Sequence, residues 1–459
     1  MIKIYNTLTE QSELIKKTAK PLRLFVCGPT VYDYAHIGNG RTYLAFDIIA
    51  NYLRHRGYRV FYLQNITDID DKIIKRAREE NSSPKAIAKK FEKAYHEDEK
   101  KLKINSVDKY ARATDFIPQI VKQIQTLIKR GHAYQIRGDG YYFDISTFPD
   151  YGKLAKRTVL QAEDAVSRID EGISKKNKGD FALWKFSKSG EPFWNTPLGK
   201  GRPGWHIEDT AITERHFGPQ YDIHGGAVDL KFPHHEAEIA QQEAASRKKP
   251  MVKIWMHAGF LLVNGKKMSK SVGNFITVRD LLKKYPPEVL RYIAASHHYR
   301  SPIDYNENLA NNALKNIKDI EEFSAKLKLI IGRSQSKSTI KNIVEKAERD
   351  FTAAMDDDFN TPKALAAIFE LINQINFGIW NLSKQEAGTI KKWVEQKFAI
   401  FKISITPPKI PVKILALAKK RELLRKQRRY LETDNLRKKI EALGYIVEDA
   451  PMGPLILKN

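Results

Sequence analysis

Three residues in this sequence have the chemistry to bind a metal ion. His234 and Glu238 are four positions apart, so on a helix their side chains share one face and can hold one ion. Ile239 stands where the zinc-protease motif His-Glu-x-x-His needs its second histidine, so a protease is not indicated. Cys27, the only cysteine, ends the short apolar run of residues 22–27. The alternatives are a surface helix pair and a buried small apolar side chain.

A second group of residues suits a polyphosphate. His36 precedes a glycine turn at the expected start of a helix, where free backbone N–H groups and the helix dipole attract anions. Residues 265–274 (GKKMSKSVGN) form a glycine-flanked loop rich in lysine and serine. Tyr43 takes the third glycine position of the dinucleotide fingerprint, and no P-loop motif occurs. Each feature alone could be a structural turn or a solvated loop.

The elements that position these residues resemble an α/β domain. Apolar residues recur at helical spacing from Ala45 to Leu53, and Gly57 suits the end of that helix. The apolar residues 22–27 and 60–63 on either side predict strands, so the segment forms a right-handed βαβ unit of a doubly wound parallel sheet. Cys27 then lies at the carboxyl end of a strand, where ligands bind in such sheets.

Composition narrows the class of protein further. The 459 residues allow two to four domains, and 42% hydrophobic residues suit a globular chain. Lys and Arg number 79 against 54 Asp and Glu, and this net charge of +25 favours a nucleic-acid partner, although lysine-rich codon usage is an alternative. A single cysteine fits a reducing compartment. No apolar run reaches about 20 residues and no signal peptide is recognisable, so we expect a cytoplasmic protein without a membrane span.

Two motifs together resemble a known class of enzymes. Residues 36–39 (HIGN) and 267–271 (KMSKS) resemble the paired signatures of class I aminoacyl-tRNA synthetases. Further segments along the whole chain closely resemble the cysteinyl-tRNA synthetase family. These are residues 25–33 (FVCGPTVYD), 65–72 (NITDIDDK), 201–208 (GRPGWHIE), 222–226 (DIHGG), 232–238 (FPHHEAE) and 356–362 (DDDFNTP).

The resemblance implies an activity and a set of site residues. Cysteine would be activated by ATP with Mg²⁺, releasing pyrophosphate, and passed to the 3′-terminal ribose of tRNA(Cys). The residues that match the catalytic positions of the family are His36, Asn39, Lys267 and Lys270. Those that match its ATP site are His36, Gly38, Asn39, Lys267, Met268, Ser269, Lys270 and Ser271. The cysteine pocket would include Thr67, Trp205 and His224, and one Zn²⁺ would be held by Cys27, Asp209, His234 and Glu238.

The sequence departs from the family pattern at two of these positions. Asn39 stands where the family usually has a second histidine, so a hydrogen-bond donor remains but a positive charge does not. Asp209 stands where the family has its second zinc-binding cysteine. A carboxylate is an accepted zinc ligand, but it is harder than a thiolate, so metal affinity should change and other metals could enter. In the family the substrate thiolate binds the zinc, which rejects serine and alanine without an editing domain.

The resemblance also implies a fold class, α/β with a class I Rossmann-like sheet, and a domain order. We expect two catalytic halves at residues 1–105 and 204–304, a connective insertion at 106–203, a tRNA-binding helical bundle at 305–400 and a basic anticodon-binding domain at 401–459. The basic run in the last domain, between Lys419 and Arg429, suits phosphate contacts, although a solvated helix face is the alternative. Tyr430, Arg437 and Tyr445 are further candidates for contacts to the anticodon. By analogy we expect a monomer.

Two rival functions remain open at this point. A related ligase joins activated cysteine to an amino sugar and shares the catalytic motifs, but it should not need the basic segment at residues 401–459. A non-catalytic RNA-binding paralogue would explain Asn39 and Asp209 as signs of decay, but the complete 267–271 motif and the retained Cys27 argue against it.

Overall fold

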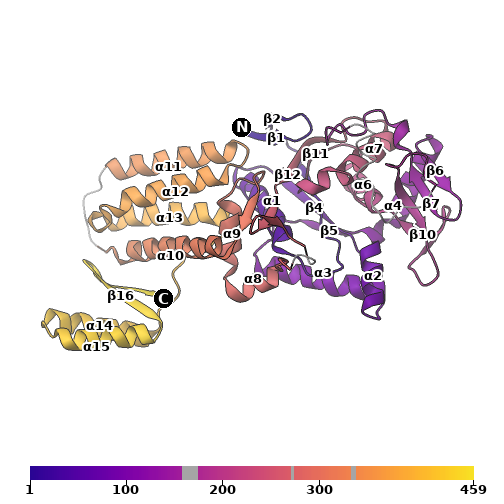
Figure 1. Ribbon diagram of the computed structural model, residues 1–459. Coiled ribbons are helices and arrows are strands. Elements are labelled where there is room, and N and C mark those ends of the chain that lie inside the picture. The colour runs from indigo at the N-terminus through magenta and orange to yellow at the C-terminus, as the bar shows by residue number, and fades with distance from the viewer. Residues whose placement is uncertain (158–173, 270–272, 332–337, 459) are drawn as a thin grey trace. The chain divides into compact units, whose positions relative to one another are not determined.

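The computed structural model describes residues 1–157, 174–269, 273–331 and 338–458 (Figure 1). The chain divides into two compact units. The first consists of Met1–Leu290, His297–Asn306 and Asp356–Phe359, and the second of Arg291–Ser296, Glu307–Met355 and Asn360–Asn459. In the described part of the chain, no helix combines the length and the apolar character that crossing a bilayer requires.

A five-stranded parallel sheet forms the centre of the first unit. Its strand order is β12 (Val252–Ala258), β11 (Tyr221–Ala227), β3 (Leu22–Val26), β4 (Val60–Ile66) and β5 (Lys109–Arg112). Every neighbouring pair is parallel. The strands β3 and β4 are joined by α1 (Ile37–His55), so the predicted βαβ unit and the predicted α/β fold class are confirmed.

The order of the strands reverses between β3 and β11. From β3 the chain builds outward through β4 to β5, whereas β11 and β12 lie on the other side of β3. In an open α/β sheet such a reversal opens a crevice at the carboxyl ends of the two strands, and this crevice is the usual place for a ligand. Cys27 is the first residue after β3 and therefore lies at this point.

Three helices that pack together complete this end of the first unit. They are α4 (Ile117–Lys129), α6 (Trp205–Phe217) and α7 (His234–Ser246). One buried apolar cluster joins them to the sheet, because Ile120, Ile207 and Ala240 lie in the same core as Phe25 and Leu63. The helices α2 (Asp71–Glu79) and α3 (Pro84–Lys101) connect β4 to β5.

A separate antiparallel sheet lies within the predicted insertion. Its order is β6 (Ala133–Ile136), β7 (Gly140–Phe143), β8 (Phe181–Phe186), β10 (Gly199–Pro203) and β9 (Trp194–Thr196). The predicted start of the insertion, residue 106, lies before β5. Because β5 pairs in parallel with β4, it belongs to the central sheet and not to the insertion. The four residues of β5 are too short and too polar to show a strand pattern in the sequence.

Smaller elements complete the first unit. A hairpin of β1 (Ile2–Asn6) and β2 (Gln11–Ile15) begins the chain. The strands β13 (Leu261–Val263), β14 (Lys266–Lys267) and β15 (Ile303–Tyr305) form a short sheet that carries the start of the 267–271 motif. The helix α8 (Val278–Lys284) follows this motif, and α9 (Pro287–Ala295) runs from the first unit into the second.

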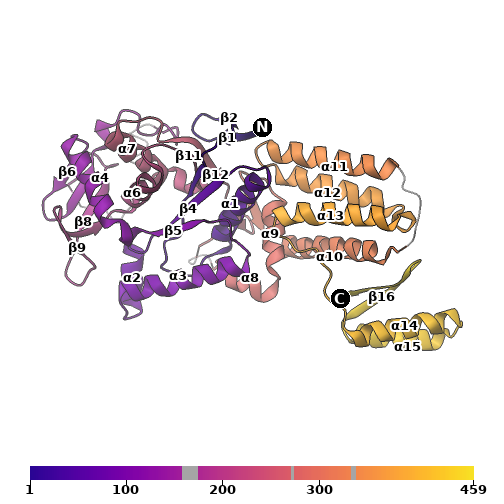
Figure 2. The same ribbon diagram turned by 180° about the vertical axis from the view of Figure 1, so that it is seen from behind.

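The second unit is mainly helical. The helices α10 (Glu307–Leu329), α11 (Ser338–Asp356), α12 (Thr361–Asn376) and α13 (Lys384–Ile400) lie side by side in both views (Figures 1 and 2). The chain ends with α14 (Val412–Lys426), α15 (Tyr430–Ala442) and the hairpin of β16 (Tyr445–Ala450) and β17 (Gly453–Lys458). These last elements share a small core of Ile414, Ala418, Ile440 and Val447.

Candidate metal and nucleotide site

Four predicted metal ligands come together at the carboxyl edge of the parallel sheet. Cys27 follows β3, Asp209 comes from the second turn of α6, and His234 and Glu238 lie one helical turn apart at the start of α7. All four side chains are buried. The prediction that His234 and Glu238 share one helix face is confirmed, because His234 Nε2 lies 3.1 Å from Glu238 Oε1.

The four side chains present one atom each to a common centre. Asp209 Oδ2 lies 3.4 Å from Cys27 Sγ and 3.1 Å from His234 Nε2, and Glu238 Oε1 lies 3.9 Å from Cys27 Sγ. Around a tetrahedral zinc ion with bonds of about 2.0–2.3 Å, neighbouring ligand atoms would be about 3.3–3.8 Å apart. The donor set of one sulfur, one nitrogen and two oxygens therefore fits a tetrahedral divalent ion.

The electrostatics of the group also suit a cation. Burial raises the pKa of Cys27, and the nearby Glu238 and Asp209 raise it further. Burial raises the pKa of Glu238 as well, and the carboxylate of Asp209 adds to this effect. Asp209 Oδ1 has no hydrogen-bond partner among the residues that the structure describes. A divalent cation would relieve the repulsion among these three buried acidic groups.

Contacts behind His234 fix the orientation of its ring. Its Nδ1 lies 2.8 Å from Nδ1 of the buried His206, so Nε2 is left for the metal group. The indole of Trp205 stacks on the His234 ring, with the centroids 4.2 Å apart and an angle of 15° between the planes. Such outer contacts hold a ligand histidine in one tautomer and one orientation.

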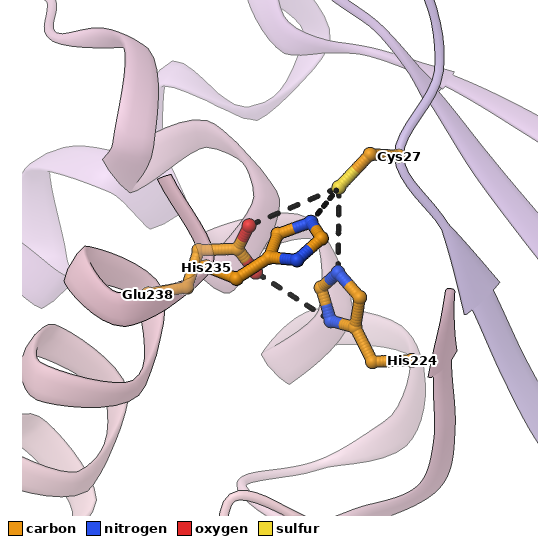
Figure 3. Close-up of side chains that lie close together, drawn as sticks. All are labelled: Cys27, His224, His235 and Glu238. Carbon is orange, nitrogen blue, oxygen red and sulfur yellow. Dashed lines mark hydrogen bonds and ion pairs between the residues drawn. The ribbon is translucent and has the colours of Figure 1, made fainter. Parts of the chain in front are cut away.

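Two further histidines lie close to Cys27 (Figure 3). His224 Nε2 lies 3.3 Å and His235 Nε2 lies 3.1 Å from Cys27 Sγ. His224 Nδ1 also lies 3.6 Å from Glu238 Oε2. Cys27, His224, His235 and Glu238 therefore form a second possible metal group, which shares Cys27 and Glu238 with the first.

His235 and its neighbours were missed by the sequence reasoning. Its Nδ1 lies 2.8 Å from His257 Nε2, and His257 Nδ1 lies 2.9 Å from the hydroxyl of Thr7. Burial lowers the pKa of His224 and of His235, which favours neutral rings beside the thiol. The paired letters His234-His235 were the only signal, and consecutive helical residues point about 100° apart.

One cavity joins the metal group to the predicted phosphate site. Its volume is about 270 Å³, and its lining includes Cys27, His36, Asn39, Trp205 and Phe275. Gly28 makes this close arrangement possible, since a Cβ atom there would lie 1.8 Å from the backbone oxygen of Asn65. The Cys27 side chain and the N-terminus of α1 thus line the same space.

His36 and Asn39 form a reciprocal cap at the start of α1. The backbone N–H of Asn39 donates to His36 Nδ1 at 3.2 Å, and the backbone N–H of His36 donates to Asn39 Oδ1 at 3.3 Å. Burial lowers the pKa of His36 to about 4. The ring is therefore neutral at pH 7, with Nδ1 as acceptor and a proton on Nε2. Nε2 of His36 and the amide nitrogen of Asn39 remain as donors for a phosphate.

The second phosphate motif lies next to the first. The backbone N–H of Ile37 donates to the oxygen of Ile276, and the edge of the Phe275 ring meets His36 with a centroid distance of 5.4 Å. A Cβ atom at Gly38 would lie 3.0 Å from Met268 Cε. Lys267 is exposed, with Nζ 5.2 Å from the centre of the Phe260 ring, and the Ser269 N–H donates to Asn274 Oδ1 at 2.9 Å. Lys270 and Ser271 lie outside the described residues.

The residues predicted for the cysteine pocket fall in two places. Trp205 lines the cavity and is 37% exposed. Among the described residues, Thr67 and His224 are buried and do not belong to the cavity lining. The hydroxyl of Thr67 donates to Glu208 Oε2 at 3.0 Å, and Glu208 is a further buried acid that the sequence reasoning did not single out.

Comparisons with known proteins agree with this arrangement. Residues 14–315 match the catalytic domain "tRNA synthetases class I (C)", and residues 350–402 match the DALR domain. The fold is similar to that of Mycobacterium tuberculosis methionyl-tRNA synthetase, with a TM-score of 0.61 at 16% identity over 84% of this chain and 90% of the other. It is also similar to LeuRS from Agrobacterium radiobacter K84, with a TM-score of 0.63 at 10% identity over 83% of each chain. The parallel sheet, the two sequence motifs at 36–39 and 267–271, and the match to the catalytic domain together define a class I tRNA synthetase.

The sequence relatives narrow the class further. The cysteine–tRNA ligase of Thermococcus onnurineus is 42% identical and aligns with 99% of this chain and 98% of its own. That of Thermococcus kodakarensis is 44% identical over 98% of each chain, and that of Methanococcus maripaludis is 41% identical over 100% of this chain and 99% of its own. The chain belongs to the cysteine–tRNA ligase family, which confirms the resemblance found in its sequence.

The metal group predicts a specific loss on mutation. Glu238→Gln removes a charged ligand atom, so zinc affinity should fall by more than about tenfold, judged by the effect of losing even an outer contact. Glu236→Gln is the matched control, because Glu236 lies on the same helix but accepts from the backbone N–H groups of Leu154 and Ala155. Elemental analysis after dialysis measures the zinc per chain. Equal zinc contents in the two variants would contradict the assignment.

The capped His36 predicts a pH response. In histidine-labelled protein, the ring resonance of His36 is identified as the one that is missing in His36→Gln. Its chemical shift should stay at the value of a neutral ring from pH 8 to about pH 5 and change only near pH 4. Because the unfolded chain takes up this proton near pH 6.5, the neutral ring contributes its full stability above that pH and loses it as pH falls toward 4. An NMR titration with a midpoint near 6.5 would show that the ring is not held in this way.

Proposed function

We propose that this chain is a cysteine–tRNA ligase, which activates L-cysteine with ATP to cysteinyl-adenylate, releasing pyrophosphate, and then transfers the cysteinyl group to the 3′-terminal ribose of tRNA(Cys). The single observation that carries the proposal is the shared cavity, whose lining includes Cys27 as well as His36 and Asn39. A site that binds a thiol beside a site that binds a triphosphate is what selective activation of cysteine requires.

The phosphate half of the cavity acts by positioning and charge. In the first step a carboxylate oxygen of cysteine attacks the α-phosphorus, and the bond to the pyrophosphate leaving group breaks. The neutral His36 donates from Nε2, and Asn39 donates from its amide, to phosphate oxygens. Lys267 and Lys270 neutralise the leaving pyrophosphate, while Mg²⁺ enters as part of the ATP substrate. Met268 and Ser269 belong to the described part of this loop, and Gly38 lets Met268 approach α1.

The other half of the cavity selects the side chain. Cys27, Asp209, His234 and Glu238 would hold one Zn²⁺, which when bound supplies a Lewis acid that prefers a thiolate to a hydroxyl. Trp205 stacks on His234 and lines the cavity, so its indole excludes water from the substrate side of the metal group. His224 faces the Cys27 sulfur, and Thr67 holds Glu208 behind the pocket.

The remainder of the chain serves the tRNA. In the proposed organisation, the central parallel sheet, with β5 included, activates cysteine, and the antiparallel sheet of β6 to β10 forms the connective insertion. The bundle at 305–400 and the domain at 401–459 bind tRNA. The exposed Lys419, Lys420 and Arg428 suit phosphate contacts, whereas Arg421 is buried and paired with Asp449. We place the enzyme in the cytoplasm as a monomer.

The rival functions lose support. An amino-sugar ligase has no use for α14, α15 and the β16–β17 hairpin, yet these form a folded module with its own core. A non-catalytic RNA-binding protein has no use for a buried thiol and a capped histidine that line one cavity, or for a buried carboxylate pair beside that thiol. Asn39 reciprocates the His36 cap, so it is not a sign of decay.

Cysteine-dependent exchange of pyrophosphate into ATP tests the activation step. The zinc-loaded enzyme should catalyse it with cysteine and at least about 10⁴-fold less efficiently with serine, because only the thiol meets the requirement of the site. Lys267→Ala should lower the rate by about 100-fold. Lys266→Ala, a neighbouring exposed lysine of β14, is the control and should change it little. Exchange that is absent, or equal with serine, would refute the proposal.

Charging of tRNA tests the second step. The double variant Lys419→Glu/Lys420→Glu should raise the KM for tRNA(Cys) roughly tenfold and lower its salt dependence, because two phosphate contacts are lost. Cysteine-dependent exchange should stay at the wild-type rate, since these residues lie in the second unit. Transfer of cysteine to an amino sugar but not to tRNA would favour the rival ligase.

A further inference from the structure

The metal group of this chain contains only one sulfur atom. Cys27 is the only cysteine in the sequence, so no other protein thiolate can reach the ion. Asp209 occupies the position between Cys27 and His234, with its Oδ2 3.4 Å from the sulfur and 3.1 Å from the imidazole nitrogen. The remaining ligand atom, Glu238 Oε1, is also an oxygen.

The shape of the site leaves the sulfur side open to a substrate. Cys27 lines the cavity, whereas Asp209, His234 and Glu238 are buried and lie behind Trp205 or deeper in the helices α6 and α7. A thiol that enters the cavity therefore meets the metal group from the side of Cys27. A cysteine ligand in place of Asp209 would already have given the ion a second sulfur before any substrate arrived.

We propose that substrate cysteine and the metal ion bind this site cooperatively, because the substrate supplies the second sulfur that Asp209 does not. The inference deepens the proposed function and rests on it. Zinc is a borderline-soft ion. The binding free energy that it gains from a substrate thiolate is therefore larger when three of its four protein ligand atoms are nitrogen or oxygen than when two of them are already sulfur. Since coupling between two ligands is reciprocal, the thiolate raises the affinity for zinc by the factor by which zinc raises the affinity for the thiolate.

A pair of matched ligands distinguishes the effect of the substrate sulfur on zinc binding from the effect of the remainder of the substrate. The sulfamoyl analogues of cysteinyl-adenylate and seryl-adenylate have the same nucleotide part and differ only in sulfur against oxygen in the amino-acid side chain. Zinc affinity is measured by competition with a chromophoric chelator in the presence of each analogue. Wild-type enzyme should bind zinc about tenfold or more tightly with the cysteinyl analogue than with the seryl analogue, within the usual range of coupling between two ligands.

The variant Asp209→Cys is the control for the role of Asp209. Under reducing conditions it provides a second protein sulfur, so the ratio of the two zinc affinities should fall toward one. Equal zinc affinities with the two analogues in the wild type would overturn the proposal. An unchanged ratio in Asp209→Cys would overturn the role assigned to Asp209.

A spectroscopic measurement on the wild type keeps the test independent of the folding of that variant. In cobalt-loaded enzyme the sulfur-to-cobalt charge-transfer band should rise about twofold with the cysteinyl analogue, because the sulfur ligands increase from one to two, and stay constant with the seryl analogue. A constant band with both would overturn the inference. Failure of the proposed function looks different, because neither analogue would then bind and cysteine-dependent exchange would be absent.

Discussion

The mutual repulsion of three buried acidic groups, which a shared cation would relieve, is the constraint on which the architecture of this site depends. Cys27, Asp209 and Glu238 come from three separate elements, are buried, and lie within hydrogen-bond or ion-ligand distance of one another. Such a cluster is costly unless protons or a metal neutralise it. The parallel sheet and the packing of α6 against α7 hold the three groups together, and His234 adds a neutral ligand.

The phosphate half of the cavity depends on the cap that His36 and Asn39 form at the N-terminus of α1. The helix α1 begins at His36 with a reciprocal cap, so the backbone donors of its first turn are partly satisfied by the same two side chains that face the cavity. Burial keeps His36 neutral, which makes it a directed donor and not a mobile charge. The charge that a triphosphate would require would then come from lysines nearby, such as Lys72, which lines the cavity, and the exposed Lys267 of the neighbouring loop.

Much of this arrangement could be predicted from the sequence, because the relevant patterns are local. Apolar runs and helical spacing predicted the β3–α1–β4 unit, and the interval of four placed His234 and Glu238 on one helix face. The contributions of β5 and His235 could not be predicted. The role of β5 depends on its pairing with β4, which is distant in the sequence. The role of His235 depends on α7 packing closely enough against the sheet for His235, next to His234, to reach Cys27. The low pKa of His36 depends on burial, which only the folded chain defines.

X-ray absorption at the zinc edge of the substrate-free enzyme tests most directly whether Cys27, Asp209, His234 and Glu238 bind one zinc ion. We expect one sulfur at about 2.3 Å from the zinc and three nitrogen or oxygen ligands at about 2.0–2.2 Å. Cys27→Ser should remove the sulfur contribution. A zinc shell made of nitrogen and oxygen alone in the wild-type enzyme would contradict the claim that Cys27 and the α6–α7 side chains form one metal site.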